Sequence, residues 1–231
     1  MFNVDPELYY KYTKEQVEEA VAFLSYKATD IKLPKEEIEG IPTLYVFRHG
    51  QTVDNANFIY SGWRDADITD DGIKQAEILA EKLKDKKLHM LVASDQIRAI
   101  KTMQIAVSKN PAAKNLEIIK DPRLKERKYG DLQGKSKLEA YLENPELSQK
   151  LRRSYNDPPP NGESIAMVLA RVNLFIAEIV PKMKEFHINV AVSCHGNSIR
   201  GFRKHFEHLT EDETAHVETP LAQDYAAYAI R

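Results

Sequence analysis

Cysteine is nearly absent from this chain, with one residue in 231, so a disulfide framework and a cysteine-based zinc site are excluded. No apolar run is long enough to cross a bilayer, and the first residues lack the basic and apolar regions of a secretory leader. The formal net charge of −2 provides no global field that would attract nucleic acid or an anionic membrane. We therefore expect a soluble, cytoplasmic protein that binds neither nucleic acid nor membrane.

The composition is that of an ordinary globular protein, 42% hydrophobic and 29% charged, without repeats or low-complexity tracts. Short runs of apolar residues predict strands at 44–47, 88–93, 116–120, 188–194 and 225–230. Helical patterns follow residues that can cap a helix N-terminus, namely Thr69, Ser94, Ser164 and Thr210. The alternation predicts an α/β fold, a three-layer sandwich with helices on both faces of a mostly parallel sheet.

Two further segments are expected to be helical or to limit a helix. Residues 138–151 are helical in composition, and Pro181 is expected to kink or end the helix that Ser164 opens. Residues 1–40 precede the first strand, and we predict that they form an N-terminal helical extension to a domain of residues 41–231.

The helix of this extension begins at a capping box that Thr13 and Gln16 can form. Its apolar stripe comprises Val17, Ala20, Val21 and Leu24, widened by Tyr9, Tyr10, Tyr12, Phe23 and Tyr26. Such a stripe usually packs on the surface of its own domain. A contact in a homo-oligomer and a partial lid over the functional site are the alternatives.

A cation and an imidazole stand at the end of the first strand, where Arg48 and His49 precede Gly50. Ligands of open α/β sheets bind outside the carboxyl ends of strands. Arginine fits phosphate, and neutral histidine is a nucleophile. His195 and Gly196 repeat the same order after a later strand. The pattern favours phosphoryl transfer through histidine; the alternative is a structural histidine and an interfacial arginine.

Further residues would complete a pocket for one phosphoryl group. Arg98 is expected in the first turn of a helix, whose N-terminus already favours anions. With Arg48 and His195 it would hold the oxygens of a group transferred to His49. Glu126 is the candidate general acid and would work best with a raised pKa. The alternatives are a solvated helix arginine and a solvated charged face.

The polar loop after Gly50 is long for a connector and shows no periodicity, as is typical of functional loops. Its candidate phosphate donors are Thr52, Asn55, Ser61 and the backbone of Gly62, and ordinary loop capping is the alternative.

Cys194 and Arg200 also satisfy C-x5-R, which is typical of cysteine-dependent phosphatases. However, no histidine precedes Cys194, and Gly196 lies one place early for that motif. We therefore expect Cys194 to be a small buried apolar residue.

An ordered set of sequence blocks resembles one known family. The blocks are R-H-G-Q-T, S-G-W, S-D-Q-I-R-A, L-K-E-R-K-Y-G-D-L-Q-G, R-R-S-Y-N-D-P-P-P, G-E-S and H-G-N-S-I-R, spread over about residues 43–211. They resemble the histidine phosphatase superfamily, and within it the 2,3-bisphosphoglycerate-dependent phosphoglycerate mutases. The set in this order is far more specific than any one block.

The resemblance implies that His49 becomes phosphohistidine and that Glu126 is the acid or base. It assigns phosphate binding to Arg48, Arg98 and His195. It implies substrate contacts at Asn55, Ser61, Gly62, Tyr129, Lys137, Arg152, Arg153 and Asn197. The implied reaction interconverts 3-phosphoglycerate and 2-phosphoglycerate in glycolysis and gluconeogenesis, primed by 2,3-bisphosphoglycerate and without a metal. The expected partner is a small phosphorylated metabolite.

Departures from the mutase pattern leave other activities open. The mutases usually carry an insertion where Pro158–Pro160 runs almost directly into Gly162, and many carry a tail over the site where little follows the last strand here. A more open site favours transfer to water, so a phosphomonoesterase is the alternative. A catalytically inactive module that binds a phosphorylated ligand is a third, although no expected catalytic residue is missing.

Overall fold

In the computed structural model, residues 2–25 and 31–231 are described, and their strands form one sheet. The strands are β1 (Thr43–Arg48), β2 (Met90–Ala93), β3 (Ile118–Lys120), β4 (Val190–Cys194) and β5 (Tyr225–Ala229). They lie in the order β3-β2-β4-β1-β5, and every pair is parallel except β1 with β5. The predicted mostly parallel sheet is confirmed, with an antiparallel strand at one edge.

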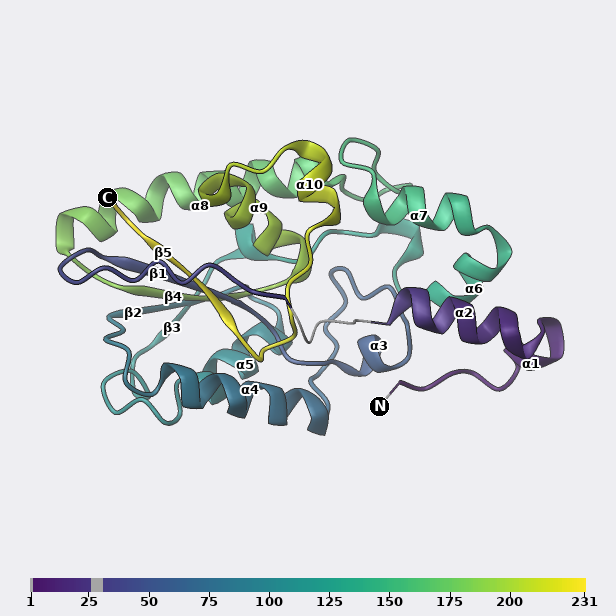
Figure 1. Cartoon of the computed structure of the whole chain (residues 1–231), viewed down its shortest axis with the longest axis horizontal. Helices are drawn as coiled ribbons and strands as arrows, with labels where there is room; N and C mark the ends of the chain where they lie inside the picture. The colour runs from purple at the N-terminus through teal and green to yellow at the C-terminus, as the bar shows by residue number, and fades with distance from the viewer. Residues whose placement is uncertain (1, 26–30) are drawn as a thin grey trace.

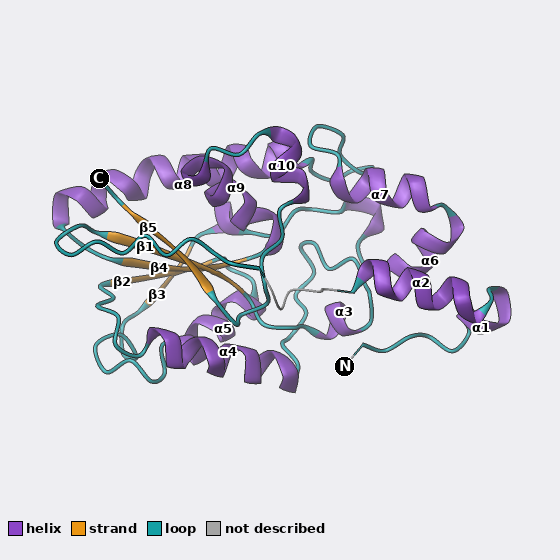
Figure 2. Ribbon diagram, in the orientation of Figure 1, coloured by secondary structure: helices purple, strands orange, loops and turns teal. Residues whose placement is uncertain are grey.

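Helices cover both faces of this sheet (Figures 1 and 2). On one face lie α8 (Ile165–Phe186) and α9 (Gly196–Glu207), and on the other α4 (Asp70–Leu83) and α5 (Ile97–Ala106). The side chains of β1 alternate between the two cores: Leu44 and Val46 join one cluster, Tyr45 and Phe47 the other. Burying each such side chain contributes about 1.5–3 kcal/mol. The three-layer α/β sandwich is confirmed.

A second group of helices lies beyond the carboxyl ends of the parallel strands (Figure 1). It comprises α1 (Leu8–Lys11), α2 (Lys14–Leu24), α6 (Lys137–Glu143) and α7 (Pro145–Arg153). The predicted capping box of Thr13 and Gln16 begins α2, which packs on α6 through a small cluster that includes Val17, Phe58 and Leu138. The remaining helices are α3 (Val53–Ala56), α10 (Glu211–His216) and the 3-10 turns Pro122–Leu124 and Gly130–Leu132.

Several sequence predictions about helix limits were wrong. Ser94 is not the N-cap of α5, which begins at Ile97 after Gln96; the Ser94 hydroxyl contacts His195 Nε2 at 2.6 Å and accepts from the Gln96 amide at 3.3 Å. Pro181 does not end α8, which continues to Phe186 with buried Ile179 and Met183 on either side of the proline; a kink at Pro181 stays a prediction. The expected helix at 138–151 is split into α6 and α7, with Asn144 capping the second.

The N-terminal aromatic residues also depart from expectation. Tyr10 is 90% exposed and Tyr9 is 46% exposed, because they belong to α1 and not to the stripe of α2. Tyr26 lies outside the described residues. Leu33 packs in the main core, and Glu36 N donates to Ala227 O at 2.9 Å, so this part of the chain runs beside β5. In the described ranges, no helix has both the length and the apolar character needed to cross a bilayer.

Candidate active site

The sheet itself brings the two strand-end histidines together. β1 and β4 are adjacent and parallel with Arg48 opposite Cys194, and the His49 amide donates to the Cys194 carbonyl at 3.0 Å. The rings of His49 and His195 are consequently 5.0 Å apart, centroid to centroid. Gly50 lets the chain leave the strand, since a Cβ there would lie 2.4 Å from the carbonyl oxygen of Gly72.

His49 is buried and held as a neutral nucleophile. Its Nδ1 lies 2.7 Å from the Gly50 carbonyl oxygen, to which it must donate, so the lone pair is on Nε2. Burial lowers the pKa of His49 well below its ordinary value, and Arg98 and Arg48 lower it further. The imidazole is therefore uncharged at neutral pH, and His49 lies in the wall of the cavity described below.

Arg98 is fixed in place by the loop that follows β1 and by the second histidine. It is 1% exposed, and its Nη2 and Nη1 donate to the carbonyls of Gly62 and Arg64, each at 2.8 Å. Its Nε donates to His195 Nδ1 at 3.1 Å, and His195 Nε2 then donates to Ser94 Oγ at 2.6 Å. Both ring nitrogens of His195 are thus engaged, Nδ1 with Arg98 and Nε2 with Ser94, and the binding of phosphate by His195 stays a prediction.

Glu126 is held by a dense set of donors. Its Oε1 accepts from the backbone amide and the side-chain amide of Asn197, both at 3.0 Å, and from the Arg127 amide at 2.9 Å. Burial raises the pKa of Glu126, but these bonds and the charges of Arg48 and Arg98 outweigh it, so the net shift is downward. This direction is opposite to the raised pKa that would suit a general acid best. A phosphoryl dianion beside this carboxylate would oppose its charge and raise the pKa.

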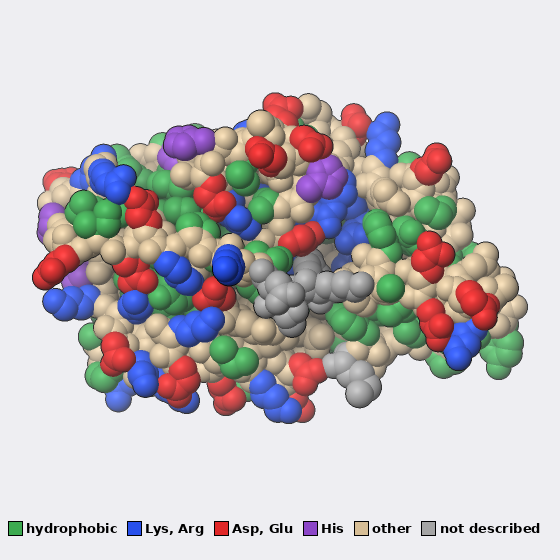
Figure 3. Space-filling view, viewed as in Figure 1, with side chains coloured by type: hydrophobic (Ala, Val, Ile, Leu, Met, Phe, Trp, Pro, Cys, Tyr) green, Lys and Arg blue, Asp and Glu red, His purple; other side chains and the backbone are tan. Residues whose placement is uncertain are grey.

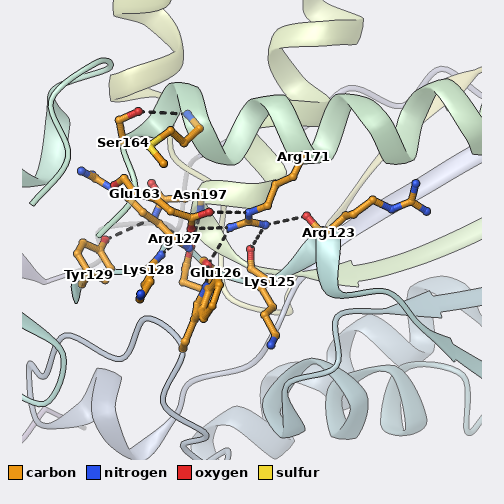
Figure 4. A network of polar contacts seen from close by, with 12 residues as sticks. Arg123, Lys125, Glu126, Arg127, Lys128, Tyr129, Glu163, Ser164, Arg171 and Asn197 are labelled. Atoms are coloured by element: carbon orange, nitrogen blue, oxygen red, sulfur yellow. Dashed lines mark hydrogen bonds and ion pairs between the residues drawn. The ribbon is translucent and has the colours of Figure 1, made fainter. Parts of the chain in front are cut away.

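The backbone around Glu126 is fastened by a single arginine of α8 (Figure 4). Arg171 donates to the carbonyls of Arg123 and Lys125 at 2.7 Å and of Glu126 at 2.9 Å. Two further bonds of 3.0 Å join Arg171 to both oxygens of Glu163. This bidentate pair is preorganised by the planar guanidinium, so the carboxylate of Glu126 has a rigid support.

These side chains line one cavity at the carboxyl ends of β1 and β4. Its wall comprises Arg48, His49, Asn55, Ser61, Gly62, Arg98, Glu126, Tyr129, Lys137, Arg152, Arg153, Gly196, Asn197, Arg200 and Glu218. Figure 3 shows Lys and Arg side chains gathered in a hollow between α10 and α7. All the predicted site residues lie in this wall except His195, which is behind it, and Thr52.

Thr52 does not line the cavity because its hydroxyl caps α3. Its Oγ1 accepts from the Asn55 amide at 3.1 Å, while the Asn55 side chain accepts from the Thr52 amide at 3.2 Å. The capping alternative is thus observed for this threonine, and its role as a phosphate donor stays a prediction.

Sequence reasoning did not assign Arg200, Glu218 or Gly196 to the wall. Arg200 follows Gly196 by four residues in α9, so helical spacing could have placed both on one face. Glu218 lies in the segment between α10 and β5, where no motif marks it.

The charges of the wall favour an anion with more than one acidic group. Among the described residues it contains six Lys or Arg side chains and two carboxylates. Arg48 and Arg98 stand by the nucleophile, whereas Lys137, Arg152 and Arg153 come from α6 and α7 across from the strand ends (Figure 1). Burial lowers the pKa of Lys137 to about 7, and Arg152 and Arg48 add to this effect.

The positive potential of this cavity disfavours the binding of a metal ion. His49, Glu126 and His195 offer ligand atoms that all lie within 4.8 Å of one another, which is close enough for a metal ion. Arg48 and Arg98 depress the pKa of His49 and His195, so their field opposes a cation there and favours phosphate. Metal independence stays a prediction.

Comparison with known proteins agrees with this chemistry. The profile of the histidine phosphatase superfamily (branch 1) matches residues 44–226. A 2,3-bisphosphoglycerate-dependent phosphoglycerate mutase of Allorhizobium ampelinum is 39% identical over 175 residues, 74% of this chain and 82% of that protein. A phosphoglycerate mutase of Schizosaccharomyces pombe is 38% identical over 180 residues, 76% and 84% of the two chains.

Among solved structures, a mycobacterial glucosyl-3-phosphoglycerate phosphatase is similar with a TM-score of 0.72 and 26% identity, covering 80% of this chain and 92% of that one. The likeness thus extends to a phosphatase as well as to mutases. Given the matching profile and the curated relatives, the chain belongs to the histidine phosphatase superfamily and is an enzyme of that superfamily.

Proposed function

We propose that this enzyme is a 2,3-bisphosphoglycerate-dependent phosphoglycerate mutase that interconverts 3-phosphoglycerate and 2-phosphoglycerate in cytoplasmic glycolysis and gluconeogenesis. The observation that carries the proposal is the cationic cavity with two ends. Arg48 and Arg98 flank the nucleophile, and Arg152 and Arg153 of α7 provide a second anion site. A mutase needs both, because its intermediate carries two phosphates and a carboxylate.

Each chemical step uses groups described above. Priming by 2,3-bisphosphoglycerate leaves a phosphoryl group on His49. The free hydroxyl of 3-phosphoglycerate attacks this phosphorus, the N–P bond breaks, and Glu126 takes the hydroxyl proton, which gives the bisphosphorylated intermediate. After this intermediate reorients, His49 Nε2 attacks its other phosphate in line, the bond between phosphorus and the substrate oxygen breaks, and Glu126 returns the proton to the leaving oxygen. The isomer leaves with phosphohistidine restored, and Arg48 and Arg98 hold the equatorial oxygens in both transfers.

A phosphomonoesterase is the second candidate function. In that case water, and not a sugar-acid hydroxyl, accepts the phosphoryl group from His49. The likeness to glucosyl-3-phosphoglycerate phosphatase supports it, as does the presence of Glu218 among the cations of the second anion site. An acidic side chain there weakens the hold on a second anionic group.

The test is an assay of purified protein with 3-phosphoglycerate, with and without 2,3-bisphosphoglycerate, that reports both isomer and free phosphate. A mutase forms 2-phosphoglycerate and depends on the bisphosphate. Release of phosphate without isomer would reject the mutase and leave the phosphatase.

Two variants of α7 extend this assay. Replacing Arg152 and Arg153 together by Ala should cut isomerisation strongly and raise the ratio of phosphate release to isomer, while hydrolysis of a small aryl phosphate changes little. Lys150→Ala removes a positive charge from the same helix outside the cavity wall and should leave both activities near wild type. Isomerase activity that survives the double change would remove the second anion site from the mechanism.

A further inference from the structure

A second carboxylate lies in the cavity wall, and the reaction described above does not use it. Glu218 follows α10, and its side chain is about one-third exposed, at 32%. Its Oε1 accepts a hydrogen bond from Arg153 Nη2 and lies 3.7 Å from Arg200 Nη2. Glu218 therefore contacts two of the cations that line the cavity, Arg153 and Arg200.

The backbone of this segment is held by arginines on both sides of Glu218. Arg203 Nη1 donates to the Glu218 carbonyl at 2.8 Å, and Arg200 Nε donates to the Val217 carbonyl at 3.1 Å. Arg48, beside the nucleophile, donates from Nη1 to the Thr219 carbonyl at 3.2 Å. Three hydrogen bonds from buried guanidinium groups thus fix the backbone on both sides of Glu218 and at Glu218 itself, and so fix the position of its Cα atom.

The charge on Glu218 persists at neutral pH. Burial raises the pKa of this carboxyl, but Arg200 and Arg153 outweigh the effect and the net shift is downward. The carboxylate thus offsets part of the positive charge of Arg153 and Arg200, whereas Arg152 in the same wall forms no ion pair with it. Arg153 is already engaged by an internal anion before any ligand reaches it.

We propose that Glu218 is a specificity-determining residue that sets the balance between isomerisation and phosphate release. Its carboxylate competes with the second anionic group of the ligand for Arg153. This competition weakens the binding of a bisphosphorylated ligand and has less effect on the binding of a ligand with one phosphate. This inference rests on the proposed function for its biological meaning. The underlying selection against multiply charged ligands is a property of binding and can be measured without turnover.

The experiment compares two proteins that cannot turn ligands over, His49→Ala and His49→Ala with Glu218→Gln. Calorimetric titration with inorganic phosphate, 3-phosphoglycerate and 2,3-bisphosphoglycerate gives three dissociation constants for each. Glutamine keeps the size and the hydrogen bond to Arg153 but removes the charge. We expect little change for phosphate and about tenfold tighter binding of the bisphosphate, with 3-phosphoglycerate between them. Unit charges about 4 Å apart near a protein surface interact by more than a tenfold change in affinity requires.

A matched control is Glu211→Gln on the same background, which makes the same change of net charge on exposed α10, outside the cavity wall. It should leave all three constants unaltered. Equal tightening for phosphate and bisphosphate, no change for either, or the same gradation in the Glu211 control would overturn the proposal. If wild-type protein forms no isomer but the graded tightening is found, the mutase assignment fails, whereas the selection by Glu218 against multiply charged ligands stands.

With His49 restored, the single variant Glu218→Gln adds a kinetic readout. We expect a lower ratio of phosphate release to isomerisation than in wild type, because the bisphosphorylated intermediate is retained longer. A rise in that ratio would contradict the proposal even if binding changed as expected.

Discussion

Lys137 gives the enzyme a pH dependence that its histidines cannot. It is the first residue of α6, and burial together with Arg152 and Arg48 lowers the pKa of its ammonium group to about 7. The pKa values of His49 and His195 lie well below the ordinary value, so both rings are neutral on either side of pH 7. Above pH 7 the free enzyme therefore loses a positive charge from the cavity wall through Lys137.

The size of the effect follows from the titration and from the contact that is lost. At pH 8, one unit above this pKa, only about a tenth of the lysine keeps its proton. A charge-assisted hydrogen bond contributes about 1.5–3 kcal/mol, so kcat/KM for phosphoglycerate should fall by about 10- to 100-fold before it levels off. Below pH 7 the second ionisation of the phosphate, with a pKa of about 6, sets the acid limit.

The assay is kcat/KM for 3-phosphoglycerate from pH 5.5 to about 9.5, because this parameter reports groups of the free enzyme. Lys137→Arg should abolish the fall above pH 7, since arginine keeps its charge throughout. The kcat/KM of Lys137→Met should lie, at every pH above 7, near the value that the wild-type enzyme reaches at high pH. If kcat/KM falls above pH 7 in both variants as it does in wild type, the fall cannot be due to the titration of Lys137.

The same pKa predicts a stability effect of known sign. The unfolded chain keeps the Lys137 proton up to about its ordinary pKa of 10.5, whereas the folded chain releases it near 7. The unfolded state thus binds more protons between these values, and the free energy of unfolding contributed by this position rises with pH across that window. Chemical denaturation of Lys137→Met should lack this rise.

Other predictions concern the remaining parts of the site. His49→Ala should remove both activity and the acid-labile phosphate left by labelled 2,3-bisphosphoglycerate, whereas Cys194→Ser should keep both; label that persists without His49 contradicts the mechanism. Glu126→Gln should slow turnover of phosphoglycerate by about 10²–10⁴-fold and that of an activated aryl phosphate much less; equal losses would assign Glu126 to binding or folding. Chelators should leave the rate unchanged and orthovanadate should inhibit; a loss that divalent metal restores would count against the site. Phe23 of α2 lies 5.7 Å from the Arg152 guanidinium, so Phe23→Leu should raise KM for phosphoglycerate by about 2- to 5-fold with aryl phosphate hydrolysis unaffected; an unchanged KM would mean that the contact does not position Arg152.

The sheet and the position of His49 could be predicted because their signals are local. A continuous apolar run marks β1, and the repetition of strand, histidine and glycine at His49 and His195 places both rings at the same edge of a parallel sheet. Arg98 could be assigned because the helix that carries it follows β2 directly. Each of these inferences needs only the period of a strand or a helix.

The errors concern groups whose partners are distant in sequence. Ser94 can cap a helix, but His195, about a hundred residues later, takes its hydroxyl. The downward pKa shift of Glu126 depends on donors from Asn197, and no local pattern reveals how many donors a buried carboxylate receives. Glu218 acquires its role only when α10 returns the chain to Arg153.

The two ends of the cavity are supported by cores of unequal size. His49 is hydrogen-bonded into the central strands, between the two large clusters that fill the domain. Lys137, Arg152 and Arg153 instead depend on α6 and α7, and α6 rests on α2 through a small separate cluster. Regions with little buried apolar contact open at lower free energy than the core and exchange their amide hydrogens sooner.

Partial denaturation should therefore separate the two activities. In rising urea, the second anion site would be lost in a subglobal opening while the histidine pair stayed assembled in the sheet. Isomerisation would vanish at a lower urea concentration than hydrolysis of a small aryl phosphate. The ratio of isomerisation to aryl phosphate hydrolysis would then measure the fraction of molecules in which α6 and α7 remain folded. A partly unfolded sample of a mutase would be mistaken for a phosphatase.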